Sequence, residues 1–270
     1  MHNNDVLKFK GEQFIFVPDN KLFVCITTEQ NLRCMINSSD FFADGTFNYA
    51  PKHYIQLYTI NCLQNGFYIP VVYFFLPHKS KQTYIDIWLF LQELSEKLIF
   101  KRLVIQKLHL DFEISACREV FPNVEIQVCR FHLGQCWWRK NSEQRLRTAY
   151  TNDDKLGKWL KLFFGLPFLS LHEIENAFIE LVFICPNLDI GFLFSDYMLK
   201  TYVEDHCLFP PKIWAQEPSE NPRTTNGSVS FHRTYNAQYH STYPSVNLVI
   251  AVLKETQEKT CTKIRSVYKG

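Results

Sequence analysis

The stretch Phe41-Phe42-Ala43-Asp44-Gly45-Thr46-Phe47 decides the predicted fold, because it places a carboxylate directly between an apolar segment and a glycine. A buried strand that ends in Asp-Gly presents its carboxylate at a sheet edge, where water and a metal ion can reach it. A second apolar segment, residues 103–110, ends directly before Asp111. We therefore expect Asp44 and Asp111 to converge. Each has a plain alternative: a turn-forming Asp-Gly for Asp44, and an N-cap on a following helix for Asp111.

The composition is that of a globular protein. The chain has 270 residues, 46% of them hydrophobic and 21% charged, which is enough for one large domain or a core with an insertion. The formal charge of +2 gives no global basic excess, so DNA contact would need a local basic patch. Nine cysteines without a CxxC pair, and a polar start, favour a nuclear or cytoplasmic protein over a secreted one. The sequence has no apolar run of about 18 residues, so we expect no transmembrane helix.

Strand patterns fall in the first half of the chain. Five segments have the apolar content and period of core strands: residues 40–48, 54–62, 67–75, 103–110 and 124–131. The first three form a meander, and predicted helices over 80–98 and 112–121 favour parallel pairing for the others. The predicted class is α/β, with a mixed five-stranded sheet flanked by helices. Two short strands are also expected near the N-terminus, over residues 14–17 and 22–26.

Helical patterns dominate the second half. They cover residues 133–205 and return after a proline-rich stretch near residue 218, over about 228–239 and 245–254. We expect four parts. These are an N-terminal extension (1–34), the first part of the core (35–150), a helical insertion (151–222) and a C-terminal helical part that completes the core (223–270).

Several motifs, taken in order, resemble those of the Mutator-like element (MULE) transposases. The first is Asp44-Gly45-Thr46-Phe47 followed by Tyr54 to Ile60. The others are Ile69-Pro70-Val71-Val72-Tyr73, Leu110-Asp111-Phe112-Glu113, Cys129-Arg130-Phe131-His132 with Gln135 to Lys140, and Arg223-Thr224-Thr225-Asn226 with Phe231-His232-Arg233. The resemblance implies an RNase H-like core with a helical insertion before the C-terminal helix. It also implies DDE-type DNA strand cleavage and transfer, with Mg²⁺ or Mn²⁺ held by Asp44 and Asp111.

The third acid of the family pattern falls on Val229, which has no oxygen to bind a metal. The nearest carboxylates, Glu217 and Glu220, lie before Arg223 and need a substantial backbone shift to replace it. We therefore expect weak or absent catalysis. The alternative is a catalytically inactive, domesticated module that binds nucleic acid or protein. A third possibility, from composition alone, is another RNase H-like metal-dependent nuclease.

Three further residues are candidate ligands. Glu113 is expected to be a solvated first-turn residue favoured by the helix dipole rather than a metal ligand. Cys129 and His132 form a CxxH pair, but a zinc site needs four ligands and no second pair has suitable spacing. We expect a structural role for this pair, with the imidazole hydrogen-bonded near the end of the last strand.

A set of basic and aromatic residues is predicted to contact DNA through phosphate pairing and base stacking. Its members are Arg130, Trp137, Trp138, Arg139, Lys140, Arg223, His232 and Arg233. The alternative is a packed amphipathic helix with a solvated charged face. The expected partner is DNA, either transposon ends or target, and a homo-oligomer is left open. We expect no membrane and no small-molecule substrate.

Overall fold

The computed structural model describes residues 6–111, 113–143, 146–152, 154–215 and 226–269. The chain divides into two compact units. The first comprises residues 1–126 and 225–270 and is called the sheet unit. The second comprises residues 127–224 and is called the helical unit. The helical unit is thus an insertion within the sheet unit, and it takes in residues 127–150, which the sequence assigned to the core.

A mixed seven-stranded sheet forms the centre of the first unit, with the strand order β3-β4-β7-β6-β5-β8-β9. The strands are β3 (Ile15–Phe16), β4 (Val24–Ile26), β5 (Asp40–Thr46), β6 (Gln56–Gln64), β7 (Phe67–Leu76), β8 (Lys107–Leu110) and β9 (Glu125–Val128). A separate two-stranded sheet joins β1 (Lys8–Phe9) to β2 (Glu12–Gln13). The predicted α/β class with a mixed sheet is confirmed.

The sheet has seven strands rather than the predicted five. Both short N-terminal strands join it, because β4 pairs with β7 and carries β3 to the edge. The meander β5-β6-β7 is antiparallel, and the Asn-Gly pair at residues 65 and 66 forms the turn between β6 and β7. The strand β8 is shorter than the predicted segment and pairs with β5 in parallel.

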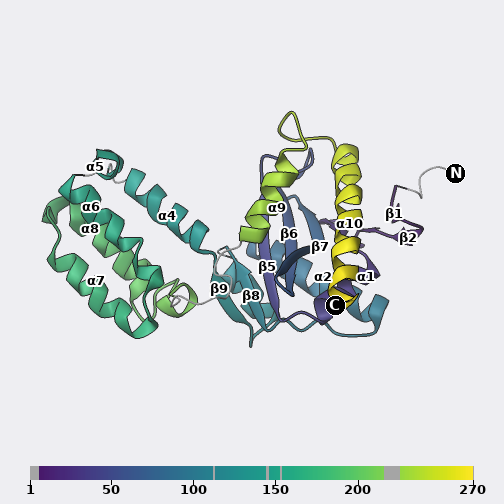
Figure 1. Cartoon of the computed structure of the whole chain (residues 1–270), viewed down its shortest axis with the longest axis horizontal. Coiled ribbons are helices and arrows are strands. Elements are labelled where there is room, and N and C mark those ends of the chain that lie inside the picture. Colours follow the sequence, from purple (N-terminus) through teal and green to yellow (C-terminus); the bar gives the residue numbers. More distant parts are fainter. Residues whose placement is uncertain (1–5, 112, 144–145, 153, 216–225, 270) are drawn as a thin grey trace. The chain divides into compact units, whose positions relative to one another are not determined.

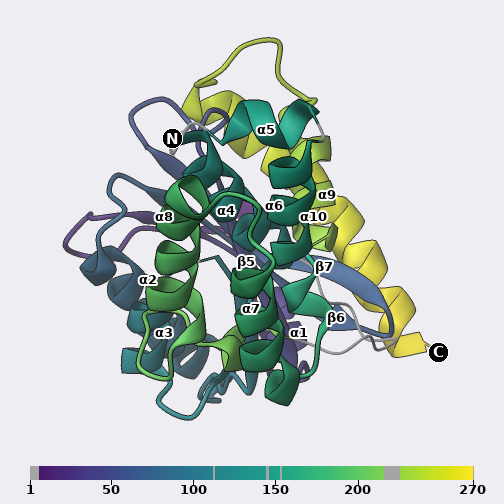
Figure 2. The same cartoon turned by 90° about the vertical axis from the view of Figure 1, so that its left-hand side faces the viewer.

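Helices cover both faces of the sheet (Figures 1 and 2). On one face lie α9 (Asn226–Asn236) and α10 (Val246–Lys269), and on the other lies α2 (Lys81–Ile99). Ser80 is the N-cap of α2, since its side chain accepts a hydrogen bond from the Thr83 amide. Two shorter helices complete the unit, α1 (Glu29–Ile36) and α3 (Ile114–Val120).

Alternate residues of the central strands pack against the two layers, as the period of a strand requires. Tyr73 and Phe75 join the core under α9 and α10. Tyr58 packs against Tyr84 of α2, with ring centroids 5.4 Å apart. Because β7 is buried along nearly its whole length, it behaves as a central strand covered on both faces.

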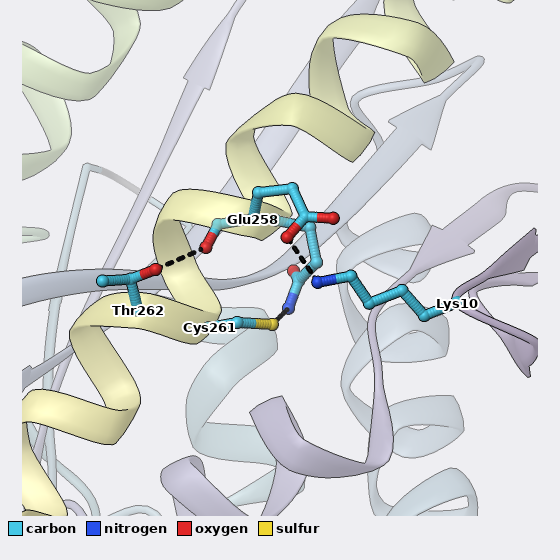
Figure 3. Close-up of polar contacts among 5 residues, drawn as sticks. Lys10, Glu258, Cys261 and Thr262 are labelled. Atoms are coloured by element: carbon cyan, nitrogen blue, oxygen red, sulfur yellow. Dashed lines mark hydrogen bonds and ion pairs between the residues drawn. The ribbon is translucent and has the colours of Figure 1, made fainter.

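Polar contacts tie α10 to the N-terminal segment. Asn31 of α1 and Gln257 of α10 exchange two buried amide hydrogen bonds of 2.9 and 2.8 Å. Figure 3 shows Lys10 paired with Glu258 on the exposed side of the same helix. The buried amide pair matters more for stability, because exposed ion pairs contribute at most about 1 kcal/mol.

The helical unit is built around aromatic side chains. Its helices are α4 (Arg130–Glu143), α5 (Arg147–Asn152), α6 (Lys155–Phe163), α7 (Ile174–Phe183) and α8 (Leu188–Met198), and α8 continues into a π-helical turn, η3 (Leu199–Val203). Trp137 makes edge-on contacts with Phe164, Tyr202 and Trp214. No helix in the described part of the chain is long and apolar enough to cross a membrane.

Candidate carboxylate site on β5 and β8

The parallel pairing of β5 with β8 directs the two predicted acids toward the same end of neighbouring strands. In the register of this pair, Phe41 lies opposite Leu108 and Phe42 opposite His109. Extended by two residues, this register would match Asp44 with Asp111. Both residues are near the carboxyl ends of neighbouring parallel strands, which is where open α/β sheets usually carry their sites.

Asp44 lies within β5 rather than in a turn, so the turn-forming alternative does not hold. Its Oδ1 accepts a hydrogen bond of 2.7 Å from the Gly45 amide. The residue is only 6% exposed, which corrects the expectation of a carboxylate open to water at the sheet edge. The strand continues for two residues beyond Asp44, and this extension and the packing of α9 account for the burial.

Asp111 follows β8 directly and is half-buried, with one carboxylate oxygen withdrawn from solvent. It does not cap the next helix, because the N-cap position of α3 is Glu113, which makes no capping hydrogen bond through its side chain. The N-cap alternative for Asp111 therefore does not hold either.

Helix α9 packs against β5 and brings His232 to the site. The imidazole Nε2 lies 3.7 Å from Oδ2 of Asp44, and both side chains are buried. The next residue, Arg233, is exposed. Val229 lies in the same helix, one turn before His232. Glu217, Glu220 and Arg223 lie outside the described residues.

Glu113 is not the solvated residue that the sequence predicted. It is half-buried, and its Oε2 is withdrawn from solvent. Burial raises the pKa of the Glu113 carboxyl, and the negative charge of Asp111 raises it further. The helix dipole does not decide the surroundings of this side chain, because α3 packs against α2 and the Glu113 carboxyl interacts with the hydroxyls of Tyr84 and Tyr58.

A buried polar pair lies next to the site, and the sequence analysis did not predict it. The Tyr84 hydroxyl donates a hydrogen bond of 2.8 Å to Oε1 of Gln56. The amide of Gln56 in turn fills the space next to Gly45, where an added Cβ would lie 1.9 Å from its Nε2. A larger residue after Asp44 would therefore force the Gln56 side chain to move. Only the polar residues at alternate positions of the predicted strand 54–62 hinted at this arrangement.

The two carboxylates are suitable ligands for a hard divalent ion, but they can fill only part of its coordination shell. Mg²⁺ is usually held by one or two carboxylates, while water and phosphate complete its shell. Asp44 and Asp111 provide this pair. Among the residues that the structure describes, no group of three or more His, Cys, Asp or Glu side chains is arranged to hold a metal ion. The residues therefore fit an ion whose remaining ligands come from water and a substrate.

The other predicted site residues belong to the helical unit. Cys129 is buried just before α4, His132 is half-buried in its first turn, and both residues have partners within the protein. Arg130 stacks on Phe168 at 4.2 Å, and Lys140 lies 5.1 Å from the ring centre of Tyr197. Arg139 is exposed and donates a hydrogen bond to Gln135.

The two adjacent tryptophans of α4 differ. Trp137 is completely buried, so it has no ring face to offer a nucleic-acid base and leaves the predicted DNA-contact set. Trp138 is half-buried and packs edge-on against Tyr150. For Trp137, the alternative to DNA contact therefore applies: it is a packed residue of an amphipathic helix.

No known protein family and no curated protein sequence matches this chain. The function is therefore inferred from the geometry of the site and from the motifs in the sequence.

Proposed function

We propose that the sheet unit is an RNase H-like core of the MULE transposase type, which acts on DNA phosphodiesters with impaired catalysis. One observation carries the proposal: β5 and β8 pair in parallel as far as Phe42 and His109, and their register, extended by two residues, leads to Asp44 and Asp111. Two acids that are distant in sequence would then be neighbours at strand ends, as a DDE-type site requires.

The surrounding architecture supports this assignment. An antiparallel meander followed by a parallel neighbour on the β5 side is the sheet expected from the motifs. The helical unit spans residues 127–224 and so precedes the segment that would carry the third acid. In addition, α9 lies against β5, so a residue of the last motif contacts the first.

The roles of the residues follow from their positions. Asp44 and Asp111 would hold Mg²⁺ or Mn²⁺, which when bound would stabilise charge on the attacking and leaving oxygens of a phosphodiester. The Gly45 amide donates a hydrogen bond to one oxygen of the Asp44 carboxylate, and the His232 imidazole lies 3.7 Å from the other. Because Val229 supplies no third carboxylate, charge neutralisation is incomplete, and loss of one such contact costs about 3 kcal/mol or a hundredfold in rate.

A second candidate is a domesticated module that binds nucleic acid without cleaving it. Two observations favour it: valine at position 229, and the burial of Asp44 beneath His232. This module would keep the fold and a binding surface after the loss of catalysis.

A plasmid-nicking assay with the full chain and Mg²⁺ or Mn²⁺ tests the first candidate. We expect weak, metal-dependent nicking that Asp44→Asn and Asp111→Asn each abolish. The matched control is Asp19→Asn, which makes the same change at an exposed loop residue and should leave nicking unchanged.

Three outcomes separate the candidates. Nicking that survives both substitutions contradicts the assignment of the site. DNA binding without nicking, with a steep loss of affinity as salt rises, favours the second candidate. If the protein neither nicks nor binds DNA, both candidates are contradicted.

A further inference from the structure

The outer surface of α7 and α8 exposes many large apolar side chains. Within the described part of the helical unit, seven of them fall between residues 179 and 193: Ile179, Val182, Phe183, Ile184, Leu188, Phe192 and Leu193. Phe183 is 85% exposed and Leu188 is 70% exposed. Dense exposed apolar surface of this kind usually marks an interaction site.

A groove runs along this surface. Its α7 wall consists of residues that recur at the spacing of one helical face, namely Glu175, Phe178, Ile179, Val182 and Phe183. The opposite wall is the π-helical turn η3, through Leu199 and Val203. The groove has a volume of about 460 Å³. An apolar groove beside a helical stripe is the shape that accepts another helix, through anchors at positions i, i+3, i+4 and i+7.

The rim of the groove is negative. Glu204 and Asp205 come directly after η3, at a helix C-terminus, where the helix dipole already places negative charge. Glu175 adds a third exposed carboxylate. Residues 171–206 contain seven Asp and Glu but one Lys, and this Lys200 pairs with Asp196 at 2.9 Å. The carboxylates on the rim therefore favour a cationic partner.

The negative charge of the rim limits the classes of molecule that can bind in the groove. Phosphates of nucleic acids and anionic lipid headgroups would be repelled by this rim. A second copy docked about a twofold axis would bring the same acidic rims together, which is also unfavourable. A protein segment that combines an apolar stripe with lysine or arginine meets both the shape and the charge.

We propose that the groove between α7 and η3 is a docking site for a basic amphipathic helix of a partner protein. The site lies wholly within the helical unit and is independent of the proposed function of the sheet unit. The exposed aromatic ring of Phe183 anchors the apolar stripe, and Glu204 and Asp205 receive a basic side chain.

Two synthetic helical peptides of about 18 residues, which share one leucine face, test the proposal. One carries lysines on its polar face and the other carries glutamates. Fluorescence anisotropy with the full-length protein measures their binding. We expect the lysine peptide to bind at least about tenfold more tightly, with an affinity that falls as salt rises.

Surface variants locate the binding. Phe183→Ser should weaken binding of the lysine peptide by about tenfold or more, without loss of fold because the side chain is exposed. Leu208→Ser is the matched control, since Leu208 is a comparably exposed apolar residue of the same unit outside the groove. The pair Glu204→Gln and Asp205→Asn should reduce both the affinity and its salt dependence.

Several results would overturn the proposal. These are no binding of the lysine peptide, equal binding of the two peptides, or equal loss of binding with Leu208→Ser. Two others would assign the surface to a different occupant: a dimer that Phe183→Ser dissociates in sedimentation velocity, or binding to phosphatidylserine vesicles that the same substitution removes.

Discussion

The sheet unit and the helical unit use their apolar residues in opposite ways. In the sheet unit, β7 and its neighbours are covered on both faces, and the polar groups of interest are buried next to them. In the helical unit, an aromatic core around Trp137 is well packed, yet α7 and α8 leave a large apolar surface outside. The contrast suggests that the sheet unit is specialised to hold a few carboxylates rigidly, whereas the helical unit is specialised for contact.

The largest effect is expected on the stability of the helical unit, and it tests whether this unit has its own core. Trp137→Ala should destabilise that unit by about 3–5 kcal/mol, because it removes a fully buried indole packed against three aromatic rings. Hydrogen exchange should rise in α6 to α8 but not in β5 to β7. Trp138→Ala, at a half-buried position, is the control and should cost less than about 2 kcal/mol. A stable Trp137→Ala variant that loses only DNA affinity would restore this residue to the nucleic-acid interface.

The next prediction tests the proposal that the site of the sheet unit lacks only a third acid. Val229→Glu places a carboxylate one helical turn before His232, which already contacts Asp44. We expect metal-dependent nicking to rise by about a hundredfold. Thr234→Glu adds the same charge to an exposed position of α9 and should have no such effect. Equal rates for the wild type and Val229→Glu would show that position 229 is not the missing ligand position.

The smallest effect concerns thiol reactivity. Burial raises the pKa of the Cys117 thiol to about 12 and also raises that of Cys25, both in the sheet unit. Cys185 of the helical unit is half-exposed. Iodoacetamide near neutral pH should therefore modify Cys185 and spare the other two, as measured by peptide mass spectrometry.

The same thiols give a direction for pH dependence. An unfolded thiol ionises near the ordinary value of 9.0, whereas the folded Cys117 keeps its proton to about 12. The folded state then binds more protons across this interval, so the stability of the sheet unit falls as pH rises from about 9 toward 12. Modification of Cys117 should appear in that range. Equal labelling of Cys117 and Cys185 at neutral pH would contradict the burial.

Local patterns in the sequence were sufficient to predict most elements of the sheet unit. The meander, the helix after Ser80 and the strand before Asp111 all follow from period and capping. The burial of Asp44 and Glu113 could not be predicted, because it depends on α9 and α2, which are distant in sequence. For the same reason, the two tryptophans of α4 look alike in sequence, although tertiary packing buries only the first completely.

The discontinuity of the sheet unit has a consequence for its synthesis. Tyr73 and Phe75 emerge from the ribosome long before α9 and α10, which cover them in the finished protein. At about 5–20 residues per second, translation of the intervening helical unit separates the two events by on the order of ten seconds. During this interval the uncovered aromatic face is open to other nascent chains. The yield of folded protein should therefore depend on chaperone supply and expression rate more than on final stability.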